Sequence, residues 1–110
     1  MKVLLDECID RYFARELVGF EVTTVPRMGW ASKKNGELPS LAEKLFDAMV
    51  TVDLSMHSQQ NMSKYAIAVI VLKSRSNKYE DLAPFAQQLI EVLAHAVNGE
   101  VTWLSPPDVS

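Results

Sequence analysis

Residues 66–72 read Ala-Ile-Ala-Val-Ile-Val-Leu, an apolar run without a polar or charged side chain. A run of this length is typical of a strand. It is too short for a helix that crosses a membrane, which needs about 20 apolar residues. A strand that is apolar on both faces is typical of a parallel sheet covered on both sides. We therefore expect this run to form a buried parallel strand.

Shorter strand-like and helix-like segments alternate along the rest of the chain. The expected strands are 2–5, 20–25, 48–52, 66–72 and 101–104. The expected helices, each with apolar residues at helical spacing, are 9–18, 38–46 and 81–97. Such alternation predicts a parallel sheet between helical layers. We therefore expect one domain over residues 1–104, with a three-layer α/β/α fold, a mostly parallel sheet of about five strands, and a tail over 105–110.

The composition fits one globular domain, with 110 residues of which 48% are hydrophobic and 23% are charged. The formal charge of −3 argues against a protein that coats nucleic acid through bulk charge. All 11 lysines and arginines lie at or before Lys78, so a locally basic surface can exist on this acidic chain. The single cysteine, Cys8, excludes an internal disulfide and favours a reducing cytoplasm. Neither a signal peptide nor a membrane partner is expected from the apolar patterning.

Two of the expected strands are followed by an acid, Asp6 in one case and Asp53 in the other. If these strands are parallel neighbours, both carboxylates emerge at the edge where open α/β sheets bind ligands. A third acid, Glu37, stands just before an expected helix. Each acid taken alone is better explained as a helix cap or a solvated loop residue than as a metal ligand. Taken together, the three supply the hard oxygen ligands of Mg²⁺ or Mn²⁺, and we expect a metal site.

Other residues near these acids fit supporting roles. Pro39 favours a helix that starts at the proline itself, which leaves Glu37 in the preceding loop. Trp30, in the long loop 26–36, is expected to pack over the core. The residues expected to support the metal or to contact the substrate are Glu7, Lys34, Asn35, Ser55, Gln60, Asn61 and Arg75.

Several short motifs carry a family resemblance. They are Leu4-Leu5-Asp6-Glu7-Cys8-Ile9, Gly29-Trp30, Lys34-Asn35-Gly36-Glu37-Leu38, Thr51-Val52-Asp53 and Gln59-Gln60-Asn61. In these motifs the chain resembles the small stand-alone PIN-like (PilT N-terminus-like) proteins of bacteria. The resemblance implies a PIN-like fold and a Mg²⁺- or Mn²⁺-dependent ribonuclease whose catalytic acids are Asp6, Glu37 and Asp53. It also implies the toxin of a toxin–antitoxin pair, with a cognate antitoxin, RNA as substrate and a homodimeric state.

The chain departs from the PIN pattern in two respects, and one of them is Pro39, where the pattern has leucine after Leu38. The other concerns the acids. PIN domains often have a fourth acid soon after the third, and here Leu54, Ser55 and Met56 follow Asp53. A catalytically weak PIN-like module that binds protein or RNA is therefore a second interpretation.

A receiver domain of two-component signalling is a third interpretation, with Asp53 as phosphoacceptor. Receivers need a lysine after the last strand, where this chain has Ser105-Pro106-Pro107, and they have no use for Glu37. A haloacid-dehalogenase-type phosphatase fits less well, because Cys8 stands where that family requires an aspartate.

Overall fold

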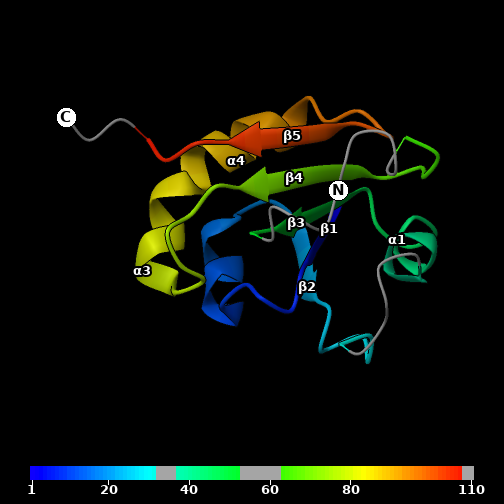
Figure 1. Cartoon of the computed structure of the whole chain (residues 1–110), viewed down its shortest axis with the longest axis horizontal. Coiled ribbons are helices and arrows are strands. Elements are labelled where there is room, and N and C mark those ends of the chain that lie inside the picture. Colours follow the sequence, from blue (N-terminus) through cyan, green and yellow to red (C-terminus); the bar gives the residue numbers. More distant parts are fainter. Residues whose placement is uncertain (32–36, 53–62, 108–110) are drawn as a thin grey trace.

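The computed structural model describes residues 1–31, 37–52 and 63–107. Its centre is a five-stranded sheet in which every pair of neighbouring strands is parallel (Figure 1). The strands are β1 (Lys2–Leu5), β2 (Glu21–Thr24), β3 (Ala48–Thr51), β4 (Ala68–Leu72) and β5 (Val101–Leu104). This confirms the α/β class and the parallel sheet expected from the sequence.

The strand order is β2-β1-β3-β4-β5. From β1 the chain moves to one side to form β2, and then returns to the other side of β1 to form β3. The order therefore reverses between β1 and β3. In doubly wound folds the crevice beyond the carboxyl ends of two such strands is the usual ligand site.

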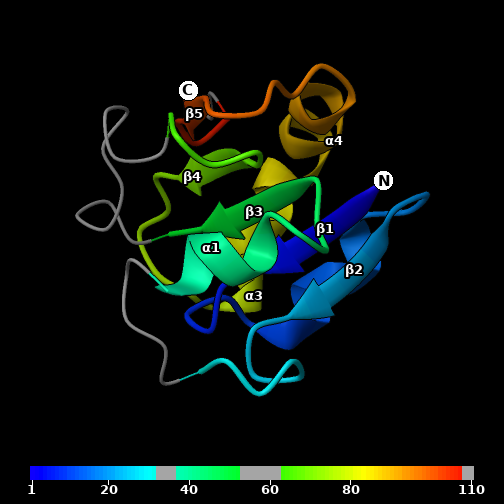
Figure 2. The same cartoon turned by 90° about the vertical axis from the view of Figure 1, so that its right-hand side faces the viewer.

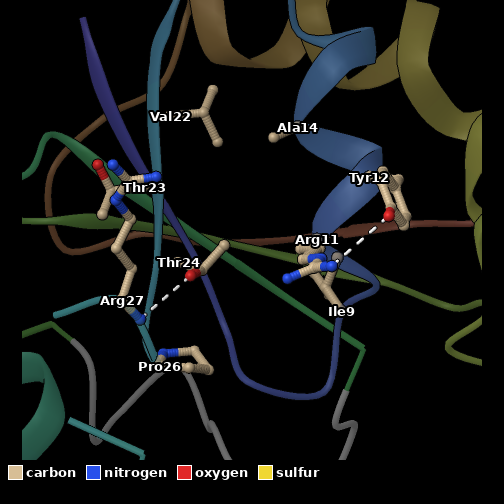
Figure 3. A pocket seen from close by; sticks show the side chains of 9 residues that line it. All are labelled: Ile9, Arg11, Tyr12, Ala14, Val22, Thr23, Thr24, Pro26 and Arg27. Atoms are coloured by element: carbon tan, nitrogen blue, oxygen red, sulfur yellow. Dashed lines mark hydrogen bonds between the residues drawn. The ribbon is translucent and has the colours of Figure 1, made fainter. Parts of the chain in front are cut away.

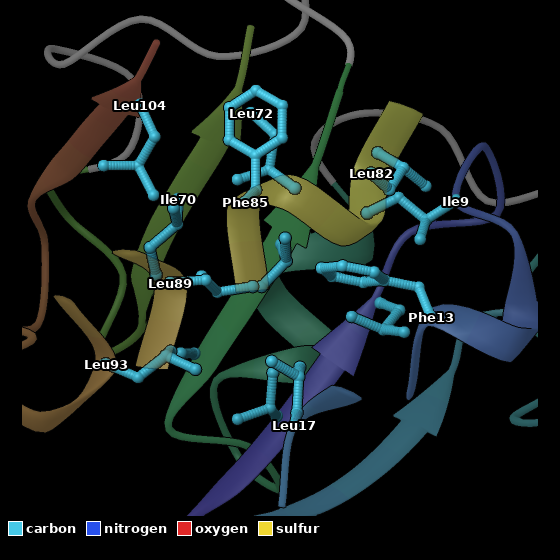
Figure 4. Packing of buried hydrophobic residues seen from close by; sticks show 14 of the residues in the cluster. Ile9, Phe13, Leu17, Ile70, Leu72, Leu82, Phe85, Leu89, Leu93 and Leu104 are labelled. Atoms are coloured by element: carbon cyan, nitrogen blue, oxygen red, sulfur yellow. The ribbon is translucent and has the colours of Figure 1, made fainter. Parts of the chain in front are cut away.

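One face of the sheet is covered by two 3-10 helices and two α-helices. These are η1 (Arg11–Glu16), α3 (Tyr79–Leu82), η2 (Ala83–Phe85) and α4 (Ala86–Ala94). Figure 4 shows how their apolar side chains pack together over the strands. Phe13, Leu89 and Leu93 are fully buried in this cluster against strand residues such as Leu5 and Ile70.

The opposite face of the sheet carries the short helix α1 (Glu37–Ala42), which lies in front of the strands in Figure 2. Leu38 and Ala42 of this helix belong to the same buried cluster as Leu4 and Met49. Trp30 packs against this cluster, and its ring meets the Phe46 ring edge-on with centroids 6.2 Å apart. The expected packing role of Trp30 is confirmed.

The helices differ from the sequence expectation in their bounds. The segment expected as helix 9–18 is a 3-10 helix that starts at Arg11, because the Asp10 side chain accepts the Tyr12 N–H at 2.9 Å and caps it. The segment expected as helix 81–97 starts at Tyr79 and passes through the short 3-10 turn η2. This turn contains Pro84, which has no N–H for an α-helical hydrogen bond.

The expectation that α1 begins at Pro39 is wrong, because Glu37 is its first residue. The N–H groups of the first turn of a helix have no partner within the helix, so the missing N–H of Pro39 costs no helical hydrogen bond there. Among the described residues, none of the helices is long and apolar enough to cross a membrane.

Candidate functional site

Asp6 lies directly after β1, at the edge where the strand order reverses. Its backbone N–H donates to the Val50 carbonyl at 2.9 Å, which extends the pairing of β1 with β3 by one residue. Since Leu5 is registered with Val50, Asp6 stands beside Thr51, the last residue of β3. The expected placement of β1 and β3 as parallel neighbours is confirmed, and it brings Asp6 to this edge.

The Asp6 side chain is buried, with 4% of its surface exposed. One carboxylate oxygen, Oδ1, accepts the backbone N–H of Glu7 at 2.8 Å. The other, Oδ2, accepts the Thr51 hydroxyl at 2.7 Å and lies 3.6 Å from the Cys8 sulfur, which donates to it. These donors fix the direction of the carboxylate, and they come from the ends of both strands.

The donors that Asp6 receives from the described residues are all uncharged. Within residues 1–31, 37–52 and 63–107, no lysine, arginine or histidine side chain forms an ion pair with Asp6. A carboxylate buried without a positive partner is costly, because it loses its hydration and gains only neutral hydrogen bonds. The carboxylate oxygens keep lone pairs that can accept from a further partner.

Cys8 completes the buried group. Its sulfur also lies 3.6 Å from the Thr51 hydroxyl oxygen. Burial raises the pKa of the Cys8 thiol above its ordinary value, and the nearby Asp6 charge contributes in the same direction. The Cys8 side chain is therefore a protonated thiol at neutral pH. A protonated, half-buried thiol is a poor nucleophile, so this geometry assigns Cys8 to hydrogen bonding and packing.

The other acids expected at the site are placed as follows. Glu37 is exposed at the start of α1, and none of the hydrogen bonds made by Asp6 reaches it. Asp53 lies outside the described residues. In the described part of the chain, no group of three or more His, Cys, Asp or Glu side chains is arranged to hold a metal ion. Of the two acids that the structure describes, Asp6 is buried and Glu37 is exposed.

The residues expected around the acids divide in the same way. Glu7, in the turn after β1, is exposed while Asp6 is buried, and Glu7 contributes its backbone N–H to the site. Arg75 is exposed in the loop after β4, and its Nε lies 3.9 Å from a carboxylate oxygen of Asp81. The residues that lie outside the described part are Lys34, Asn35, Ser55, Gln60 and Asn61.

Thr51 is a partner of Asp6 that the sequence expectation did not single out. In the sequence it reads as an ordinary strand residue between Val50 and Val52. The available signal is its position: once β1 and β3 are taken as parallel neighbours, a hydroxyl at the end of β3 falls beside the acid at the end of β1.

No protein-family model, no curated protein and no solved structure matches the chain. Fold alone does not determine function, so the function has to be argued from the chemistry at the Asp6 edge.

Proposed function

We propose that this chain is a metal-dependent ribonuclease of the PIN-like type. The observation that carries the proposal is the buried Asp6 carboxylate, which accepts three neutral donors at the ligand-binding edge of a parallel sheet. A divalent cation bound there compensates the buried charge. A carboxylate oxygen is a hard ligand, which favours Mg²⁺ or Mn²⁺ over softer metals.

Asp6 is the residue to which we assign the metal first, with Glu37 and Asp53 as the further acids of the proposal. When bound, the metal supplies a water of lowered pKa and stabilises the charge that develops on a phosphodiester during hydrolysis. Thr51 and the Glu7 N–H hold the Asp6 carboxylate in one orientation. Burial of this group keeps bulk water away from Oδ2 and strengthens its interactions with positive charge.

The biological setting follows from the resemblance to stand-alone PIN-like proteins. We propose a cytoplasmic toxin whose partners are RNA, a cognate antitoxin and a second copy of the chain. Lys34, Asn35, Ser55, Gln60, Asn61 and Arg75 are assigned to the metal-bound water or the RNA backbone in this proposal.

A second candidate is favoured by the strand order. The order β2-β1-β3-β4-β5 is that of flavodoxin-like folds, which receiver domains share. In a receiver, Asp53 accepts a phosphoryl group. Against this candidate, β5 is followed by Ser105-Pro106-Pro107, without the lysine that a receiver needs. Stable labelling of Asp53 by acetyl phosphate distinguishes it from the nuclease.

Cleavage of a single-stranded RNA by the purified chain tests the nuclease directly. We expect cleavage with Mn²⁺ or Mg²⁺, none with EDTA, and none from Asp6→Asn or Asp53→Asn. Asp47→Asn is the matched control, because Asp47 is an exposed acid at the opposite edge of the sheet, where it accepts the Lys2 N–H at 2.8 Å. Cleavage that survives in both Asp6→Asn and Asp53→Asn would overturn the proposal. RNA binding without cleavage by the wild type would instead favour the catalytically weak binding module.

A further inference from the structure

A groove of about 620 Å³ runs between η1 and the edge strand β2 (Figure 3). The floor of the groove is apolar and consists of Ile9, Ala14 and Val22. Ile9 is buried in the core, and the partly buried Ala14 and Val22 pack against it. Arg11 on the η1 side and Arg27 on the β2 side stand at its two walls. The groove thus combines an apolar base with a positive charge on each side.

The charge of this groove contrasts with that of the whole chain. The formal net charge is −3, yet none of the described residues that line the groove is acidic. The acids closest along η1 already have partners: Asp10 caps the Tyr12 N–H, and Glu16 accepts the Tyr79 hydroxyl at 2.5 Å. In the described part of the chain neither Arg11 nor Arg27 forms an ion pair with an acid, so both guanidinium groups can contact an anion.

Tyr12 contacts Arg11, one of the two arginines of the groove, and also the neighbouring Arg15. Tyr12 is 47% exposed, and the guanidinium carbons of Arg11 and Arg15 lie 5.2 and 5.0 Å from the centroid of its ring. Arg11 also donates from Nη2 to the Tyr12 hydroxyl at 3.5 Å. Such cation–π contacts reduce the conformational entropy that the arginine side chains lose when they bind a ligand.

The apolar floor narrows the class of anion. Inorganic phosphate uses the arginines and leaves the floor unused. A nucleic-acid strand has phosphates for the arginines and flat base or sugar surfaces for the floor, and proteins that bind single strands combine these two features. A duplex keeps its bases stacked inside and cannot place them on Ile9 or Val22.

The groove adjoins the Asp6 edge. Thr24, which lines the groove, is registered with Leu5, the residue before Asp6. Ile9, at the other side of the groove, donates its N–H to the Asp6 carbonyl at 3.0 Å. A strand that follows the groove therefore approaches the carboxyl end of β1.

We infer that this groove binds one strand of nucleic acid, with Arg11 and Arg27 on its phosphates and its bases on the apolar floor. The choice of RNA over DNA rests on the proposed function. The affinity of the groove for a single strand does not depend on cleavage.

Fluorescence anisotropy with a labelled single-stranded oligouridylate, in EDTA, tests the inference without catalysis. The variant is Arg11→Ala/Arg27→Ala. The matched control is Lys44→Ala/Lys64→Ala, which removes the same charge from two exposed lysines that precede β3 and β4 and do not line the groove. We expect the arginine variant to lose roughly tenfold in affinity, and its slope of log K against log salt to fall by about 1.4, since each lost phosphate contact contributes about 0.7. The control should stay within about twofold of the wild type.

The inference would be overturned if the wild type did not bind the oligouridylate, or if the arginine variant bound it as tightly as the wild type. Equal losses of affinity in the two double variants would also overturn it. So would wild-type binding of an abasic oligomer, or of a polyglutamate peptide, as tight as its binding of the oligouridylate. Tighter binding of the oligouridylate than of the abasic oligomer supports the role of the floor. Failure of the nuclease proposal gives a different pattern, in which the oligonucleotide binds through the arginines and is never cleaved. Failure of the groove alone appears as cleavage with the same KM in the arginine variant.

Discussion

The hydroxyl of Thr51 donates a 2.7 Å hydrogen bond to the buried carboxylate of Asp6, across 45 residues of sequence. This contact joins the end of β3 to the end of β1 at the point where the strand order reverses. It fixes a carboxylate where a doubly wound fold places its ligand. The function proposed for the chain depends on this arrangement.

Replacement of Thr51 by valine keeps the shape of the side chain and removes the donor. We expect the free energy of unfolding to fall by about 1–3 kcal/mol, because the charged carboxylate loses a hydrogen bond inside the protein. Urea denaturation measures this change. The control is Thr102→Val, a half-exposed threonine of β5, which should change stability by less than about 0.5 kcal/mol. Equal effects of the two substitutions would argue against the importance of the Asp6 contact.

Phe13 attaches η1 to the sheet. Its side chain is fully buried with Leu17 and Phe85 in the cluster of Figure 4. We expect Phe13→Ala to lower the free energy of unfolding by about 3–5 kcal/mol, because it leaves a cavity in a closed core. Val18→Ala is the control, since Val18 is 79% exposed. A small effect of Phe13→Ala in the same urea titration would mean that η1 packs differently in solution.

The Tyr79 phenol should titrate at higher pH than an ordinary tyrosine. Its hydroxyl donates to Glu16, and this hydrogen bond is the main cause that raises the pKa of Tyr79 above 10.0. A folded-state pKa above the unfolded value adds stability below about pH 10, and that stability is lost as the pH rises through the folded pKa. Ultraviolet titration of tyrosinate, with Tyr79→Phe to identify the signal, measures the pKa. In Glu16→Gln the pKa should return toward 10.0; an unchanged value would contradict this cause.

Cys8 should react slowly with iodoacetamide in the folded protein at neutral pH. Its thiol is half-buried and its pKa is raised by burial, so little of the reactive thiolate is present. Mass spectrometry of the alkylated protein gives the rate, and urea provides the unfolded reference. We expect the rate to rise steeply on unfolding at constant pH. A folded-state rate equal to the unfolded one would show that the thiol is accessible.

Most of the strands were predictable because they are short apolar runs bounded by polar residues or turns, whereas β2 was predictable from the alternation of Phe20, Val22 and Thr24 before Pro26. Residues 2–5 and 101–104 form strands over the expected bounds. The helices were less predictable, since their ends depend on local contacts such as the Asp10 cap and on Pro84. Pro39 misled the prediction because proline is tolerated throughout the first turn of a helix and so does not mark the first helical residue.

The candidate site was predictable in part. An acid after an apolar strand located Asp6 at the sheet edge, but its burial and its donors depend on the register between β1 and β3. A single sequence does not contain that register in any local pattern. Thr51 and Cys8 therefore emerged as partners of Asp6 only from the three-dimensional arrangement.

Mn²⁺ titration of the metal-free protein by isothermal calorimetry tests most directly whether Asp6 holds a divalent cation. We expect saturable binding by the wild type and by Asp47→Asn, and loss of this binding in Asp6→Asn. At a Mn²⁺ concentration 100 times its Kd, the wild type should gain about 2.7 kcal/mol of stability. A wild-type protein that takes up no Mn²⁺ or Mg²⁺, or an Asp6→Asn variant that binds as tightly as the wild type, would contradict the account.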